Sequence, residues 1–73
     1  MLEKELRINK FIGKQIRVKR HALNISQHRL ADHLGVSYQQ LQKIENGRNR
    51  VSAARLILIS EYFGVSPMTF MGQ

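Results

Sequence analysis

The chain has 73 residues, no cysteine, and 12 Lys and Arg against five Asp and Glu, which gives a formal net charge of +7. This length allows one small domain, residues 1–73, with little room for an enzyme pocket beside its core. The missing cysteine excludes disulfides and thiolate zinc sites, and there is no apolar run of about 18 residues that could span a membrane. The basic charge favours a polyanionic partner, either nucleic acid or an anionic membrane surface.

The first helix is predicted from about Arg7 to Leu23, and residues 1–7 are expected to form a flexible arm before it. At about 100° per residue, one stripe of this helix is apolar. The stripe consists of Ile8, Ile12, Ile16 and Leu23. Asn24 follows directly, and asparagine tolerates the left-handed conformation that ends many helices. We therefore expect the helix to stop there.

Four further helices are predicted, each opened by a serine that can cap its first turn. The caps are Ser26, Ser37, Ser52 and Ser66. The middle three helices end in residues that favour the left-handed conformation. These stops are Gly35, Asn46-Gly47 and Gly64. Ser37 and Gln40 have capping-box spacing, and Ser66-Pro67 would open a short fifth helix through Met71. The predicted fold class is a compact all-α, five-helix domain.

Residues 26–47 contain two predicted helices joined by a short turn with glycine in it, which is the sequence form of a helix-turn-helix. On the second of these helices the apolar residues face the first helix, and the polar residues form one continuous arc on the other side. The arc consists of Tyr38, Gln39, Gln42, Lys43 and Asn46. Amide and ammonium groups can bond the major-groove edges of adenine and guanine. The arc therefore favours double-stranded DNA as the partner, although an ordinary solvated face would look similar.

The chain resembles the phage repressor and Cro-like helix-turn-helix family, often called XRE-like, from about Ile12 to Phe70. The matching stretches are GKQIR at 13–17, ISQ at 25–27, LA at 30–31, LGVS at 34–37, IENG at 44–47, Leu56, and FGVS at 63–66. The resemblance implies a transcriptional regulator, more often a repressor than an activator. It also implies binding as a symmetric homodimer to palindromic operators, with the third helix in the major groove. The absence of cysteine fits a cytoplasmic location, and the absence of catalytic sequence motifs argues against an enzyme.

Carried over residue by residue, the resemblance assigns base reading to the third helix and phosphate binding to the segments around it. The base readers would be Tyr38, Gln39, Gln42 and Lys43. The phosphate-binding residues would be Gln27, Ser37, Asn46, Arg48, Asn49 and Arg50. The resemblance also pairs Arg20 with Glu45 as a structural ion pair.

Two residues depart from the family pattern, which usually has acidic side chains just after the second cap. This chain has His28 and Arg29 there. A positive charge at a helix start is unfavourable by about 0.3–1 kcal/mol. Opposite phosphates would offset that cost, so we add both residues to the predicted phosphate contacts.

A homodimer surface is predicted on the later helices, where apolar residues lie off the core stripe. Its candidates are Ile57, Leu58, Tyr62, Met68 and Phe70. The same residues could instead pack under neighbouring helices or the arm. The three histidines lack the spacing of metal ligands, so neither a metal nor another cofactor is expected. The alternative functions are an antitoxin, which would repress its own operon and bind a toxin, and a basic module that lies on membranes.

Overall fold

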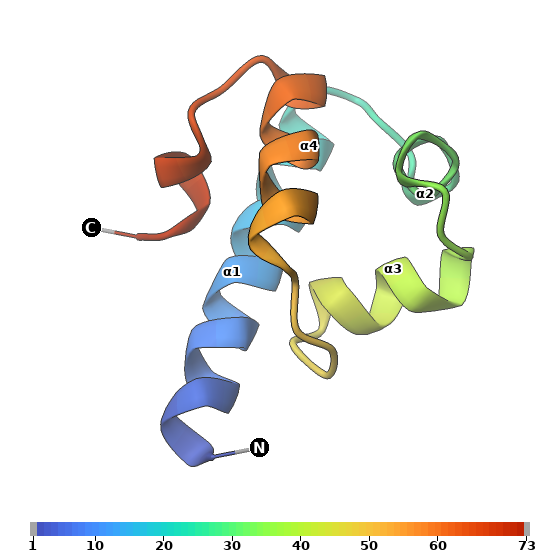
Figure 1. Cartoon of the computed structure of the whole chain (residues 1–73). Coiled ribbons are helices and arrows are strands. Elements are labelled where there is room, and N and C mark those ends of the chain that lie inside the picture. Colours follow the sequence, from blue (N-terminus) through green and yellow to red (C-terminus); the bar gives the residue numbers. More distant parts are fainter. Residues whose placement is uncertain (1, 73) are drawn as a thin grey trace.

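The computed structural model describes residues 2–72, which form four α-helices and one terminal 3-10 helix, with no strand among them. The elements are α1 (Glu3–Ala22), α2 (Gln27–Leu34), α3 (Tyr38–Glu45), α4 (Ala53–Phe63) and η1 (Pro67–Phe70). In the view of Figure 1, α1 runs the height of the molecule and passes behind α4, with α2 and α3 on one side and η1 on the other. No helix in the described part of the chain is both long enough and apolar enough to cross a membrane.

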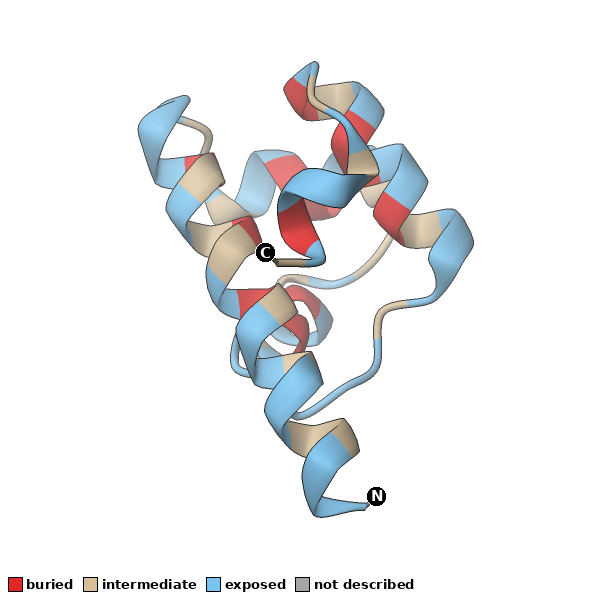
Figure 2. Cartoon of the chain, turned by 90° about the vertical axis from the view of Figure 1, so that its left-hand side faces the viewer, coloured by how far each residue is buried: buried red, intermediate tan, exposed pale blue. Residues whose placement is uncertain are grey.

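The core lies where the five elements converge, and each of them contributes to it. Its completely buried apolar side chains are Ile16, Leu30, Leu41, Ile59 and Phe70. Buried positions therefore line the inward sides of the helices, and exposed positions cover the outward sides (Figure 2). Because each helix buries only one stripe, the outer face of α3 remains open to a partner.

The predicted caps and stops are confirmed. The hydroxyl oxygen of each capping serine accepts a hydrogen bond from a backbone N–H in the first turn of its helix. Ser37 and Gln40 form the complete capping box, with reciprocal bonds of 3.0 and 2.9 Å. Asn24 adopts a left-handed φ of 56°. These local signals divide the chain into its helices much as the sequence predicts.

The prediction for the start of α1 is wrong, because the helix begins at Glu3 instead of Arg7. Residue 1 of the predicted arm lies outside the described residues, and Glu3 to Arg7 are helical. Glu3 and Glu5 stand in the first turn, where negative charge is favourable, and Glu3 pairs with Arg7 at 3.4 Å. Ile8, predicted to lie on the buried stripe, is 52% exposed because the first turns of α1 extend beyond the core (Figure 2).

Two further expectations about the ends of elements are corrected. Leu23, placed on the buried stripe, is 42% exposed because it lies at the C-cap, where the helical repeat has stopped. The fifth helix is a four-residue 3-10 helix, not an α-helix. Its hydrogen bonds span three residues, as in Met71 N–H to the carbonyl of Met68 at 3.1 Å, and the left-handed Gly72 follows directly.

Helix α3 lies unusually close to α1, and two glycines allow this. A Cβ atom on Gly13 would lie 2.3 Å from the carbonyl oxygen of Ile44 and 2.7 Å from that of Glu45. At the end of α3, Gly47 has a φ of +77°, and a Cβ there would lie 2.6 Å from the Cα atom of Lys10. The absence of side chains at both positions lets the end of α3 rest directly on α1.

Candidate nucleic-acid interface

Helices α2 and α3 form a helix-turn-helix whose turn is set by Gly35. Gly35 adopts a φ of +69°, and the N–H of Val36 then bonds back to the carbonyl of Ala31 at 3.0 Å. Ala31 is buried in the core together with Leu41 of the next helix. This packing turns the polar side of α3 away from the core, as predicted.

The polar arc on α3 combines exposed and half-buried side chains. Gln39, Lys43 and Asn46 are exposed, whereas Tyr38 and Gln42 are half-buried. Nε2 of Gln42 donates a 2.9 Å hydrogen bond to the hydroxyl of Tyr38, one turn earlier. The arc therefore contains a linked pair of side chains and not five independent ones.

A ring contact from α2 extends this linked pair. The imidazole of His28 stacks on the phenol ring of Tyr38, with ring centroids 4.2 Å apart and planes 4° from parallel. The sequence analysis missed both contacts. The spacing of Tyr38 and Gln42, four residues apart on one helix, could have indicated their bond. The stack with His28 depends on how α2 packs against α3.

A buried ion pair joins α1 to the end of α3, with Arg20 and Glu45 in the places that the resemblance implies. Arg20 donates from Nε to Oε2 of Glu45 at 2.8 Å and from Nη2 to Oε1 at 3.0 Å. Nη1 of Arg20 also donates to the carbonyl of Ile25 at 2.9 Å. Nε2 of Gln27 donates to Oε1 of Glu45 at 2.9 Å. Gln27 is thus part of a structural network, with one amide N–H left to donate to a phosphate.

The other residues predicted to bind phosphate differ in their exposure and in whether their hydrogen-bonding groups already have partners. Arg29, Arg48 and Asn49 are exposed. The backbone N–H of Ser37 is engaged by Gln40 in the capping box, so only its hydroxyl proton remains available. Arg50 forms an ion pair with Glu5 of α1, with 3.3 Å between Nε and Oε2.

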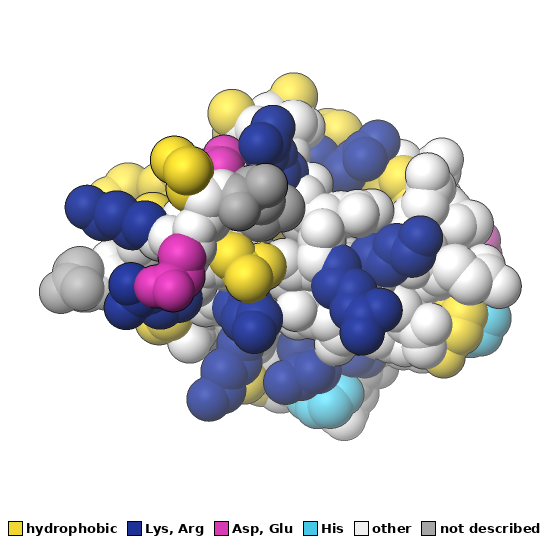
Figure 3. All heavy atoms as spheres, turned by 90° about the horizontal axis from the view of Figure 1, so that it is seen from below, with side chains coloured by type: hydrophobic (Ala, Val, Ile, Leu, Met, Phe, Trp, Pro, Cys, Tyr) yellow, Lys and Arg dark blue, Asp and Glu magenta, His cyan; other side chains and the backbone are white. Residues whose placement is uncertain are grey.

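Positive charge dominates the face that carries the start of α1 and the loop after α3. Seen from below, Lys and Arg side chains are spread over this face and acidic side chains are few (Figure 3). Within the described residues, no group of three or more His, Cys, Asp or Glu side chains is arranged to hold a metal ion. The face suits a large anion with many negative groups.

The predicted dimer candidates do not form one uniform surface. Ile57, Leu58 and Met68 are 47%, 46% and 66% exposed. Tyr62 is half-buried and stacks on His33, with centroids 4.1 Å apart. The assignment of Phe70 is wrong, because its side chain is completely buried. The 3-10 turn brings this ring against Phe63 in the core, at 6.0 Å between centroids.

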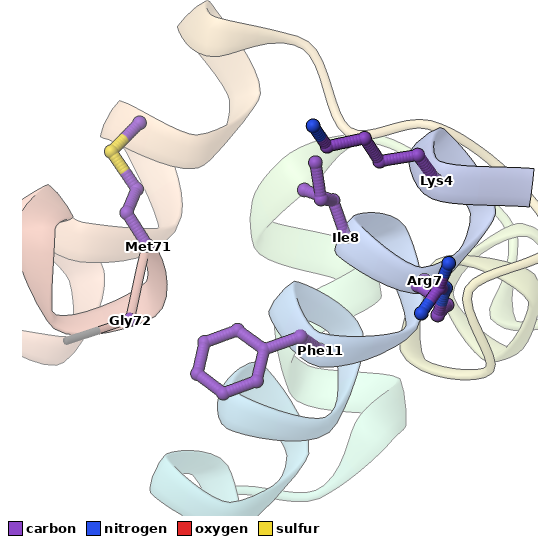
Figure 4. A pocket seen from close by; sticks show the side chains of 6 residues that line it. All are labelled: Lys4, Arg7, Ile8, Phe11, Met71 and Gly72. Atoms are coloured by element: carbon purple, nitrogen blue, oxygen red, sulfur yellow. The ribbon is translucent and has the colours of Figure 1, made fainter.

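A shallow groove of about 570 Å³ lies between the first half of α1 and the end of the chain (Figure 4). It is lined by Lys4, Arg7, Ile8, Phe11, Met71 and Gly72. None of these residues belongs to the predicted base-reading or phosphate-binding sets. The groove therefore contains none of the residues predicted to contact DNA.

Curated proteins with similar sequences are transcriptional regulators by name. An uncharacterized HTH-type transcriptional regulator of Sinorhizobium medicae is 46% identical over 59 residues, which are 81% of this chain and 42% of that protein. An uncharacterized transcriptional regulator in the ATPase CF(0) region of Rhodospirillum rubrum is 45% identical over 58 residues, 80% of this chain and 54% of that protein. The chain thus spans about half, or less, of the length of these relatives.

Solved structures share the fold. The restriction-modification controller protein C.AhdI of Aeromonas hydrophila matches with a TM-score of 0.77 and 25% identity, covering 88% of this chain and 96% of that one. The clp gene regulator ClgR of C. glutamicum matches with a TM-score of 0.81 and 25% identity, covering 86% and 82%. The family model HTH_3, described as helix-turn-helix, matches residues 14–70. The chain therefore belongs to the HTH_3 helix-turn-helix family, and the relatives that it matches are named as transcriptional regulators.

Proposed function

We propose that this chain is a sequence-specific DNA-binding domain that represses transcription in the cytoplasm by binding operator half-sites through α3. The observation that carries the proposal is the outer face of α3. Its exposed amide and ammonium groups, Gln39 and Lys43, stand beside the linked pair of Tyr38 and Gln42. Glutamine can bond both N6 and N7 of adenine, and lysine can donate to O6 and N7 of guanine.

The charge of the chain supports the attraction that must come before base reading. Lys and Arg that neutralise phosphates release counterions, and each phosphate contact contributes about −0.9 to the slope of log affinity against log salt. The exposed cations beside α3 that could do so are Arg29 and Arg48, joined by Arg50 when its pair with Glu5 opens. These contacts would hold the protein on DNA and set its register, whereas α3 would select the sequence.

A homodimer fits this mode of binding, because two helices about 34 Å apart reach successive major grooves on one face of the duplex. Ile57, Leu58 and Met68 are the exposed apolar side chains that support a dimer surface. They lie on α4 and η1, outside the helix-turn-helix, so that association through them would leave α3 uncovered.

The test is selection from a randomised duplex pool at about 150 mM salt. The unmodified chain is compared with Gln39→Ala and Lys43→Ala, and the control Lys4→Ala removes the same charge as Lys43→Ala at a position outside α3. We expect one palindromic motif, altered at particular base pairs by the two α3 variants and unaltered by the control. Weak binding to all sequences that no variant changes would contradict base reading and would direct attention to a protein partner such as a toxin.

A further inference from the structure

The side chain of Tyr38 is held at two points. One face of its ring is covered by the imidazole of His28 from α2, with centroids 4.2 Å apart and planes 4° from parallel. At the other end, its hydroxyl accepts the 2.9 Å hydrogen bond from Gln42. Because the two contacts come from different helices, the orientation of the tyrosine depends on both of them.

These contacts do not use all the hydrogen-bonding groups of Tyr38 and Gln42, and the remaining groups could bond a DNA base. Gln42 uses one N–H in its bond to Tyr38 and keeps its second N–H and its Oε1 oxygen, which together can bond an adenine edge. The hydroxyl of Tyr38 acts as an acceptor in that bond, so its own proton can still be donated. His28, Tyr38 and Gln42 are therefore an ordered group whose reading atoms are unoccupied.

We propose that His28 is a specificity-positioning residue rather than a phosphate ligand. By stacking on Tyr38 it holds the phenol ring, and through the hydroxyl it holds the amide of Gln42, in the orientation that selects the base pair facing the start of α3. A side chain held in place before binding loses less conformational freedom when DNA arrives. This inference rests on the proposed function, since it requires that α3 reads bases.

The same helix offers a matched control. His33 also stacks on a tyrosine, Tyr62 of α4, with centroids 4.1 Å apart and planes 19° from parallel. Helix α2 thus carries two exposed histidines, each against one tyrosine ring. Of the two tyrosines, only Tyr38 belongs to the polar arc of α3. Comparing His28→Ala with His33→Ala therefore separates an effect on base selection from the general loss of a ring stack.

The experiment measures affinities for the selected duplex and for duplexes changed at one base pair. His28→Ala should lower discrimination at one base pair of each half-site by roughly 2- to 10-fold, the loss expected for one aromatic stack. His28→Phe should keep that discrimination, because phenylalanine can stack without any charge. His33→Ala should leave it unchanged, and the salt slope should be the same for all four proteins.

Tyr38→Phe provides a second variant, because it removes only the hydroxyl that Gln42 bonds. It should weaken discrimination at the same base pair as His28→Ala. Thermal unfolding checks that each variant folds. The histidine variants are expected to fold, because both histidines are exposed.

Three results would overturn the inference. If His28→Ala weakens binding to all duplexes alike, makes the salt slope shallower by about 0.9 and is not rescued by His28→Phe, then His28 is a phosphate ligand. If the unmodified chain selects a motif and every His28 variant keeps it unchanged, the inference alone fails. If the unmodified chain selects no motif, the proposed function fails and the inference fails with it.

Discussion

Arg20 and Glu45 form a two-point ion pair between α1 and the end of α3, with N–O distances of 2.8 and 3.0 Å. Their side chains are 6% and 1% exposed. The pair also bonds Gln27 at the start of α2 and the carbonyl of Ile25, two residues before it. The pair therefore ties α1 to both helices of the motif.

Glu45→Gln should destabilise the fold by about 3–5 kcal/mol, because it leaves the guanidinium of Arg20 buried without a counter-charge. The measurement is the free energy of unfolding in urea. The double variant Arg20→Met with Glu45→Leu should cost much less, since neither charge remains. Equal losses in the single and double variants would show that the penalty does not come from an unpaired charge.

Gly13→Ala should destabilise the protein by about 1–3 kcal/mol, although alanine is the better helix former by about 1 kcal/mol. The new Cβ would meet the backbone carbonyl oxygens of Ile44 and Glu45 at 2.3 and 2.7 Å, and backbone atoms cannot move aside as a side chain can. Gly64→Ala is the comparison, because a Cβ there meets nothing within 4 Å and only the φ of +72° opposes it. A stabilised Gly13→Ala protein would mean that α1 and α3 are not in this close contact.

Asn24→Gly should leave stability unchanged or raise it slightly, and Asn24→Ala should lower it by about 1 kcal/mol. The reason is the φ of 56° at this position, which glycine adopts freely, asparagine tolerates and alanine resists. Thermal unfolding of the unmodified chain and the two variants gives the order of their stabilities. If alanine is no worse than asparagine, the left-handed conformation does not persist in solution.

Glu5→Gln should tighten DNA binding a few-fold and make its salt dependence steeper by about one phosphate contact. The change frees Arg50, which is paired with Glu5 at 3.3 Å, and removes a negative charge from the basic face. Stability should change by no more than about 0.5 kcal/mol, because the side chains of Arg50 and Glu5 are 66% and 41% exposed and water screens the pair. Glu61→Gln on α4 removes the same charge elsewhere. If both variants gain affinity equally, only net charge matters and Arg50 is not a phosphate contact.

Phe70→Ala should destabilise the monomer by about 3–5 kcal/mol, because it empties a completely buried site in the core. Met68→Ala, at a side chain that is 66% exposed, should barely alter unfolding of the monomer. If Met68 lies in the dimer surface, its variant should instead weaken self-association in sedimentation experiments. A monomer that tolerates Phe70→Ala would contradict the core position of that ring.

Local chemistry allowed much of this protein to be predicted from its sequence. Serine caps, the capping box of Ser37 and Gln40, and the left-handed stops at Asn24 and Gly35 act within one turn of a helix. The period of 3.6 residues then separates the polar arc of α3 from its apolar side. These features need no knowledge of how the helices pack, so the helix-turn-helix and its outward face followed from short-range patterns.

Only the tertiary structure decided which side chains meet across elements. The stack of His28 on Tyr38 and the pair of Glu5 with Arg50 depend on the positions of separate helices and loops. The burial of Phe70 likewise depends on the 3-10 helix that places its ring on the core. Sequence periodicity tells which side of one helix is apolar, but the partner on that side is determined by how the chain returns on itself.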